Sequence, residues 1–409
     1  MTKRRSRIRI AAAILSATAT VLGLIAGAPA AEAHSSARIT SVVGGLAAPR
    51  GIAFDGRGAM YVAESGVAGA GEAGLTHTGK VDKFKLGRTS PTWSTGFDSF
   101  YAAEDPSAPP DVLGPEGLSA AGKDCGRRNR DGEHEDRGKH NDCQVYMIMS
   151  ESTPGIADAS GGAVNAPQAG HLYRLNGRTG QATSKSDFGS QMYQFTIDHE
   201  SLFPEDFPDS NPYGVLVTRG KHGGMRTFVA DAGANTISEV MRDGTIRVVS
   251  YIPNETEPPF RDSTPTCIAA GPDGYLYVGT LNFVANLFAP GGGGFSNVWR
   301  VNPNANFPTE PTLWATGLTT VTACTFDRSG NFWAAEMFAG GLDANPPGDV
   351  VRIPFRHPSR HDQFGAGRLA VPGGIAQGPD GAMYVTVGSS APGVNGGVMR
   401  VSTRHHHDD

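Results

Sequence analysis

The chain has 409 residues, and its 35 basic and 40 acidic side chains give a formal net charge of −5 at pH 7. Without residues 1–33, which hold five of the basic residues, the chain has 30 basic and 39 acidic side chains and no cluster of Lys and Arg. It therefore lacks the electrostatic footprint of proteins that bind nucleic acid or anionic membranes. We therefore exclude both as partners of the mature protein and expect a small molecule, a glycan or another protein instead.

Residues 1–33 have the pattern of a secretory signal peptide. Five basic residues within the first nine positions precede an apolar run from about Ile10 to Ala28, and Ala-Glu-Ala at positions 31–33 provides a cleavage site. The alternative is a membrane anchor that stays attached. We expect cleavage before His34 and export, so the mature protein is predicted outside the cell or on the outer side of the membrane. Whether export uses the Sec or the twin-arginine route stays open.

Six segments share one pattern, in which an apolar strand, a turn with Asp or Ser beside Gly, and a second apolar strand follow one another. In chain order they begin at Pro49, Pro115, Pro212, Pro265, Val321 and Pro372. In four copies the turn glycine stands three residues before an aromatic residue. The pairs are Gly58 and Tyr61, Gly274 and Tyr277, Gly330 and Trp333, and Gly381 and Tyr384. Because glycine accepts the positive φ of such turns, each copy predicts a tight β-hairpin.

A third strand with alternating apolar residues follows each hairpin, and fourth strands can be placed from Thr245 and Pro311. Four-stranded antiparallel units in series predict propeller blades. We therefore predict an all-β fold, a six-bladed β-propeller over residues 34–403, with seven blades or a two-sheet sandwich as alternatives. The spare strand at residues 39–46 is expected to pair with the last blade and close the ring. Residues 404–409 are expected to be a disordered tail.

The repeated P-x-G-[IL] entry, the D-x-x-G-x-x-[YW]-V turn and the [RI]-x-R-[VI] third strand resemble the repeats of NHL-type propellers. In an exported chain, the segments VVGGLAAPRGIAFDGRGAMYVAE, GPEGLS, NPYGV and GGIAQGPDGAMYV resemble the ScyD/ScyE family of secreted propellers. The likeness covers residues 36–403. It implies a secreted six-bladed propeller, and it brings no set of catalytic residues with it.

Two positions of the repeat gather polar side chains where we expect the mouth of the channel. The residue after each strand entry gives Arg50, Glu116, Tyr213, Thr266 and Thr322, with Gly373 in the last copy. The end of the second strand carries carboxylates in alternate blades, namely Glu64, Asp231 and Glu336. Such carboxylates are candidate ligands for calcium, which takes six to eight oxygen ligands. The alternative, which we favour, is that each accepts hydrogen bonds from loop amides or pairs with a neighbouring arginine.

Four cysteines in an exported chain predict two disulfides, and we favour Cys125–Cys143 and Cys267–Cys324, although three connectivities are open. The first pair would close an insertion in blade two, residues 121–143. Its dense charges of both signs and its two histidines fit a solvated surface loop better than a zinc or EF-hand site.

Long loops between second and third strands, in blades one, two, four and five, are expected on one face, the predicted binding face. Our first hypothesis is a secreted, monomeric, non-catalytic binding or scaffolding protein without a cofactor. The alternative is an exported hydrolase of the calcium-dependent lactonase or esterase type, with its site at the channel mouth. A lyase would need a histidine near the channel, and none falls at either ring position. The sequence leaves the question of catalysis open and leans against it.

Overall fold

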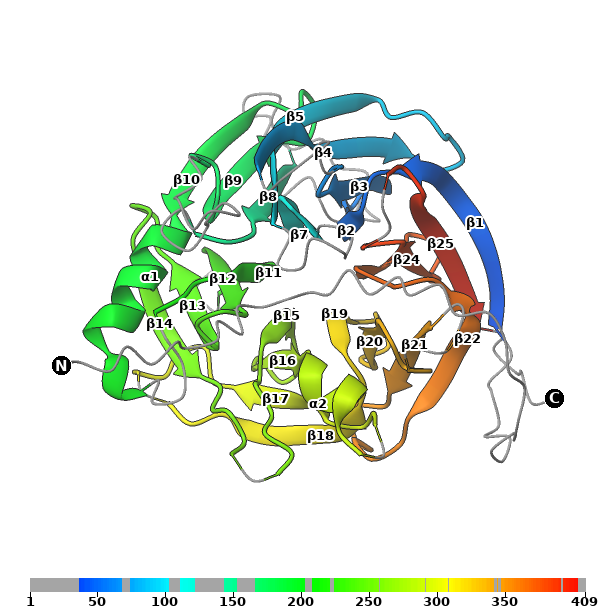
Figure 1. Cartoon of the computed structure of the whole chain (residues 1–409). Helices are drawn as coiled ribbons and strands as arrows, with labels where there is room; N and C mark the ends of the chain where they lie inside the picture. The colour runs from blue at the N-terminus through cyan, green and yellow to red at the C-terminus, as the bar shows by residue number, and fades with distance from the viewer. Residues whose placement is uncertain are drawn as a thin grey trace, which may run out of the picture.

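The computed structural model describes residues 37–67, 74–102, 111–121, 143–152, 166–202, 208–220, 224–256, 258–290, 292–307, 309–341, 344, 347–390 and 393–403. These residues form six antiparallel sheets arranged as blades around a central channel, so the predicted six-bladed propeller is confirmed (Figure 1). The predicted signal peptide, the tail and most of the blade-two insertion, with Cys125, lie outside the described residues.

Each blade runs outward from the channel in sequence order. Blade 1 contains β2 (Pro49–Phe54), β3 (Ala59–Glu64), β4 (Gly74–Lys85), β5 (Trp93–Ala102) and β6 (Asp111–Leu113). Blade 2 contains β7 (Pro115–Ala121), β8 (Gln144–Met149), β9 (His171–Asn176) and β10 (Ala182–Asp187). Blade 3 contains β11 (Pro212–Arg219), β12 (Met225–Asp231), β13 (Thr236–Val240) and β14 (Ile246–Tyr251).

The remaining blades repeat this order. Blade 4 contains β15 (Pro265–Ala270), β16 (Leu276–Thr280), β17 (Ser296–Val301) and β18 (Thr312–Leu318). Blade 5 contains β19 (Val321–Phe326), β20 (Phe332–Glu336), β21 (Gly348–Ile353) and β22 (Asp362–Leu369). Blade 6 contains β23 (Ile375–Gln377), β24 (Met383–Val387), β25 (Gly396–Thr403) and β1 (Ala37–Leu46). Five blades thus have the predicted four strands, and β6 adds a fifth to blade 1.

The ring is closed by β1, as predicted from the spare strand at residues 39–46. It pairs antiparallel with β25 along its whole length, from Ala37 opposite Thr403 to Leu46 opposite Gly396. This pairing supplies blade 6 with its outer strand. Both of the edges that would otherwise be open are therefore satisfied within one sheet.

The turn aspartate explains the repeated D-x-x-G-x-x-[YW] pattern. In blade 5, Asp327 Oδ1 accepts hydrogen bonds from the backbone N–H groups of Ser329 and Asn331, and its Oδ2 accepts one from the Trp333 indole. Tyr61 makes the same bond to Asp55 in blade 1. In blades 4 and 6 the bond runs from Tyr277 to Asp273 and from Tyr384 to Asp380, and there the aspartate directly precedes the turn glycine. The pattern therefore encodes the geometry of a turn, and it does not mark a site.

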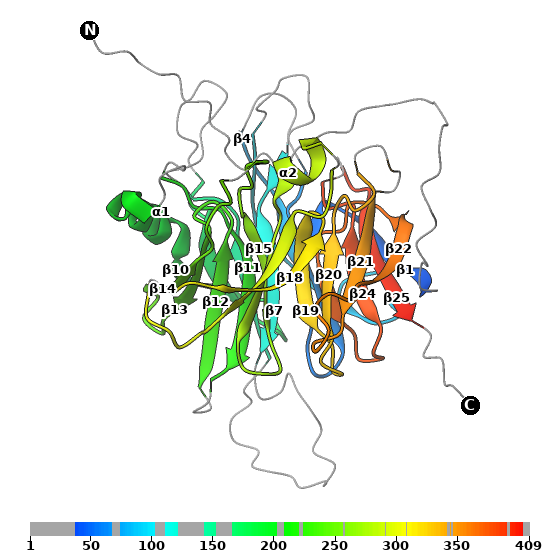
Figure 2. The same cartoon turned by 90° about the horizontal axis from the view of Figure 1, so that it is seen from below.

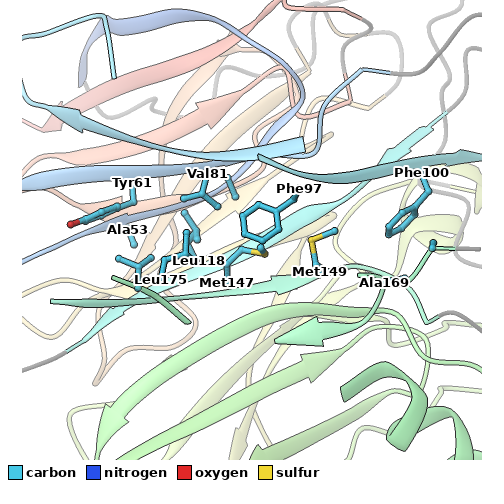
Figure 3. Close-up of a cluster of buried hydrophobic side chains, with 13 residues drawn as sticks. Ala53, Tyr61, Val81, Phe97, Phe100, Leu118, Met147, Met149, Ala169 and Leu175 are labelled. Atoms are coloured by element: carbon cyan, nitrogen blue, oxygen red, sulfur yellow. The ribbon is translucent and has the colours of Figure 1, made fainter. Parts of the chain in front are cut away.

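Six clusters of buried apolar side chains fill the six seams between neighbouring blades. Figure 3 shows the cluster between blades 1 and 2, where Tyr61, Val81 and Phe97 of blade 1 meet Leu118 and Met147 of blade 2. The alternating apolar residues of the strands face these seams. The core is consequently a ring of interfaces, and the channel is left free to carry polar groups.

Among the described residues, two α-helices interrupt the β structure, and the sequence analysis missed both. Helix α1 (Phe188–Asp198) lies in the connection from blade 2 to blade 3, where the Asp187 side chain accepts a hydrogen bond from the N–H of Ser190. Helix α2 (Phe283–Phe288) follows β16 and stands above the blades in Figure 2. We call the face that carries α2 the top face. No helix in the described ranges is long and apolar enough to span a membrane.

Candidate functional site

A cavity of about 70 Å³ lies where the six innermost strands begin, at the top end of the channel. Three consecutive residues of every blade line it. They are residues 50–52, 116–118, 213–215, 266–268, 322–324 and 373–375. The first member of each triplet is the ring position predicted from the repeat. The structure therefore brings Arg50, Glu116, Tyr213, Thr266 and Thr322 together, each with at most 4% of its surface exposed.

Irregularities in the strand pairing determine the direction of the ring side chains. In blades 3, 4 and 5, the register of the innermost strand shifts across Tyr213, Thr266 and Thr322, each of which is skipped in the pairing with the second strand. In blades 1 and 2 the shift spans two residues, which include Arg50 and Glu116. A bulge leaves its extra residue outside the ladder and redirects its side chain. This local break places five polar side chains in one cavity wall.

An ion pair joins blades 1 and 2 across the cavity. Arg50 Nη1 lies 3.5 Å from Glu116 Oε1, and Arg50 Nη2 donates a hydrogen bond of 3.2 Å to the carbonyl of Val112 in β6. Both side chains are 1% exposed. Glu116 is the one carboxylate among the described residues that line the cavity, and it faces a guanidinium. The pair therefore offers donors and acceptors of roughly balanced charge, an arrangement ill-suited to a hard cation.

The two ring threonines also tie neighbouring blades together. Thr266 Oγ1 donates a hydrogen bond to the carbonyl of Val321, and Thr322 Oγ1 donates one of 2.9 Å to the carbonyl of Pro372. Each bond reaches the first residues of the next blade. The threonines thus have a structural role that the sequence did not reveal, because the bond depends on contact between blades.

The glycine of the P-x-G entry sets how closely the innermost strands approach. A Cβ built on Gly51 would lie 2.3 Å from the Glu116 carbonyl oxygen, and one on Gly117 would lie 2.6 Å from that of Tyr213. Gly374 repeats this contact with the Arg50 carbonyl oxygen, at 2.3 Å. Contacts under 3 Å with backbone leave no room for any side chain. The motif is therefore a packing requirement of the ring.

Tyr213 connects the cavity to an apolar cluster on the top face. The cluster also contains Leu281 and Phe283 after β16 and Met337 and Phe338 after β20. The rings of Phe283 and Phe338 lie 6.0 Å apart in an edge-to-face arrangement. The wall of the cavity is thus charged on the side of blades 1 and 2 and adjoins apolar groups on the side of blades 3 to 5. Sequence reasoning did not find this asymmetry, because the cluster joins loops of three blades.

The second predicted ring is not part of the cavity wall. Glu64 Oε2 accepts a hydrogen bond of 2.7 Å from the N–H of Ala47, and Glu336 Oε1 accepts one from the N–H of Thr319. Asp231 accepts four hydrogen bonds, from Ser210 Oγ and from the N–H groups of residues 211, 233 and 234. These three carboxylates hold the segments that lead into strands β2, β19 and β11. Each of the three carboxylates accepts hydrogen bonds from loop amides, which is the structural role that we favoured over metal binding.

Charged partners next to two of these carboxylates were also missed. Glu336 hydrogen-bonds to Asp349 opposite it on β21, and burial together with Asp349 raises the pKa of Glu336 well above its usual value. Glu64 Oε1 lies 3.3 Å from Lys80 Nζ, and burial raises the pKa of Glu64 to about 7. Burial also raises the pKa of Asp231, against the effect of its four donors. Within the described ranges, no three His, Cys, Asp or Glu side chains are grouped closely enough to hold a metal ion.

Replacing Glu64 with Gln is expected to change how stability depends on pH. A folded pKa raised above the unfolded value means that ionised Glu64 destabilises the fold, so its contribution is lost as pH rises from about 4.5 through 7. Glu64→Gln keeps an acceptor for Ala47 and should gain roughly 3 kcal/mol relative to the parent between pH 4 and pH 8.

Urea denaturation at both pH values, with and without a chelator, measures the effect of Glu64→Gln. The matched control is Glu310→Gln at an exposed position, which should leave the pH profile unchanged. Parallel stability profiles for the parent and Glu64→Gln would contradict the prediction. A profile that changes only when the chelator is present would instead indicate a metal at Glu64.

One predicted disulfide, Cys267–Cys324, is present and joins the innermost strands of blades 4 and 5. Cys143 is also disulfide-bonded, but its predicted partner Cys125 lies outside the described residues. No histidine lies among the described residues that line the cavity.

No model of a known protein family matches the chain, and neither does any curated protein. Solved structures do match it. A glucose dehydrogenase is similar at 10% identity and a TM-score of 0.50, over 90% of this chain and 100% of that chain. The PQQ-bound aldose sugar dehydrogenase of Streptomyces coelicolor is 13% identical, with a TM-score of 0.47, over 91% and 99%. Virginiamycin B lyase of Staphylococcus aureus is 14% identical, with a TM-score of 0.41, over 90% and 99%. At these identities the likeness concerns the fold alone.

Proposed function

We propose that the chain is an exported, non-catalytic propeller that binds a small, hydroxyl-rich molecule or the end of a glycan at the cavity. The observation that carries the proposal is the set of bulges that turn Arg50, Glu116, Tyr213, Thr266 and Thr322 into one cavity wall. Bulges of this kind concentrate next to binding sites. Burying polar groups costs free energy. The four other copies of the repeat fold without a charged residue at the ring position, so the charges of Arg50 and Glu116 are not required by the repeat itself.

The chemistry of the cavity favours a neutral ligand with several hydroxyl groups. The Arg50–Glu116 pair presents both donors and acceptors without excess charge, and Tyr213 adds a hydroxyl beside an apolar surface. A sugar has the same combination of hydroxyl groups and apolar C–H faces. Ligand pockets usually measure about 300–1,000 Å³, so a cavity of about 70 Å³ admits only a terminal group while the rest of the ligand lies across the top face.

Export and family membership belong to the same proposal. The charged head and apolar run of residues 1–33 support secretion, as does the disulfide between Cys267 and Cys324. The strand-entry and turn motifs quoted from the sequence support a place in the ScyD/ScyE family.

Isothermal titration of the mature chain with monosaccharides and short oligosaccharides tests the proposal. At least one sugar is expected to bind, and Tyr213→Phe, which removes only a hydroxyl, should weaken it about fivefold or more, the effect of one hydrogen bond. Tyr384→Phe makes the same change at the turn of blade 6 and should leave binding intact. Absence of sugar binding, or equal effects of the two variants, would contradict the proposal.

The calcium-dependent hydrolase is separated by metal content and by thermal stability in chelator. Such an enzyme requires a stoichiometric ion whose removal lowers the melting temperature. For the binding protein that we propose, the melting temperature should be the same with and without chelator. A shift that disappears in Asp231→Asn would favour the hydrolase.

A further inference from the structure

The Cys267–Cys324 disulfide forms part of the wall of the channel. Both cysteines line the same cavity as the ring residues, one on β15 and one on β19. Structural disulfides of exported proteins usually lie where solvent and reagents reach them poorly. A disulfide in the wall of a solvent-connected cavity is instead open to chemistry with small molecules that enter it.

The two cysteine residues differ in their exposure. Cys267 is 4% exposed and belongs to the apolar cluster between blades 4 and 5, whereas Cys324, which packs against the same cluster, is only half-buried. Its neighbours on β19, Ala323 and Thr325, are half-buried as well. Cys324 is therefore the more exposed residue of the pair, and its sulfur atom is the expected point of attack.

The disulfide also replaces the close packing found at other seams. In blades 1, 2, 3 and 6 the residue after the ring position is glycine, and in blade 4 it is Cys267. The disulfide and the hydrogen bond from Thr266 to the Val321 carbonyl join the innermost strands of blades 4 and 5 near their first residues. Breaking the bond would loosen the wall of the cavity at blades 4 and 5 while the other four glycine contacts remain.

We propose that Cys267–Cys324 is a thiol-exchange site inside the channel, which takes thiols small enough to enter the cavity, such as 2-mercaptoethanol. The thiolate attacks Sγ of Cys324, the bond between the two sulfur atoms breaks, and Cys267 leaves as a thiolate that takes a proton from water. The products are a mixed disulfide on Cys324 and a free thiol at Cys267. The step needs no oxidant or reductant beyond the thiol itself.

The position of Cys267 beside Cys324 makes the exchange reversible. After the bond breaks, Cys267 stays in its apolar cluster beside Cys324, because the two strands are still paired within their blades. Deprotonated Cys267 can attack Cys324 Sγ, which restores the disulfide and releases the small thiol. The adduct should therefore build up in proportion to the thiol concentration and disappear when the thiol is removed.

The rate of exchange in the folded protein tests this proposal. With 2-mercaptoethanol, the rate is expected to rise in proportion to thiol concentration, and peptide mapping after acid quenching should place the adduct on Cys324. A protein dithiol such as reduced thioredoxin is too large for the channel and should not react. A rate that levels off at high thiol concentration, or equal reaction with thioredoxin, would show that opening requires unfolding and would overturn the proposal.

Two single variants provide a matched control for access. Cys267→Ala leaves the Cys324 thiol and Cys324→Ala leaves the Cys267 thiol, and both lack the same disulfide. Iodoacetamide should alkylate the Cys324 thiol about tenfold faster than the Cys267 thiol, because reaction depends on exposure. Equal rates would contradict the direction of attack. These measurements need no sugar ligand, so they stand or fail independently of the proposed binding function.

Discussion

A chain that begins at Ala47, and therefore lacks β1, is expected to lose its stable monomeric fold. Removal of β1 takes the buried side chains of Ile39, Val43 and Leu46 out of the interfaces on both sides of blade 6. At about 1.5–3 kcal/mol for each buried apolar side chain, the loss is roughly 5 kcal/mol. That is comparable to the whole stability of many domains, about 5–15 kcal/mol. The edge of β25 would also be open to pairing between molecules.

Size-exclusion chromatography and urea denaturation of the shortened chain measure this effect. The matched control begins at His34 and retains β1. Aggregation or a large fall in the denaturation midpoint is expected for the shortened chain alone. If the shortened chain were a monomer with an unchanged urea denaturation midpoint, the ring would be stable without β1 and the prediction would be wrong.

Gly51→Ala should destabilise the protein by at least about 3 kcal/mol, although it adds a single methyl group. The new Cβ would lie 2.3 Å from the Glu116 carbonyl oxygen and 2.7 Å from the Leu118 nitrogen, and both atoms belong to the backbone of blade 2. Neither can turn aside as a side chain would. The innermost strands of blades 1 and 2 must move apart, which also disturbs the Arg50–Glu116 pair.

Gly44→Ala provides the matched control for that substitution. Gly44 lies in β1, and a Cβ built there meets no atom within 4 Å. The free energy of unfolding of the Gly44→Ala variant should match that of the parent within about 0.5 kcal/mol or slightly exceed it. Denaturant midpoints of the two variants decide the question, and equal midpoints would mean that the innermost strands tolerate a wider spacing than their contacts indicate.

Much of the fold could be predicted because every blade repeats the same local physics. The glycine at each turn and the aspartate that binds the aromatic side chain act within a few residues, as between Asp273 and Tyr277. The ring of Arg50 and its equivalents followed from overlaying the copies. The pairing of Cys267 with Cys324 followed from their places in consecutive copies.

What could not be predicted depends on contacts between elements. The pairing of Glu336 with Asp349 requires the register of β20 and β21 across a long loop, which no local pattern sets. The hydrogen bond from Thr266 to Val321 needs the spacing between blades. Apart from the Asp187 cap, helix α1 has neither an acidic residue in its first turn nor a basic residue in its last turn, so its sequence carries few signals of a helix. Its formation rests on the buried Phe188 and Met192, which pack against blades 2 and 3.

The pairing of Ala37 with Thr403 also has a kinetic consequence. Contacts between residues so distant along the chain are slow to form, because a long loop must close before they give any stability. Strand β1 is synthesised before any blade exists, whereas its partner β25 is synthesised after all the other strands. The ring should therefore close in a late step, and the five earlier blades must remain soluble with an unfinished seam until that step occurs.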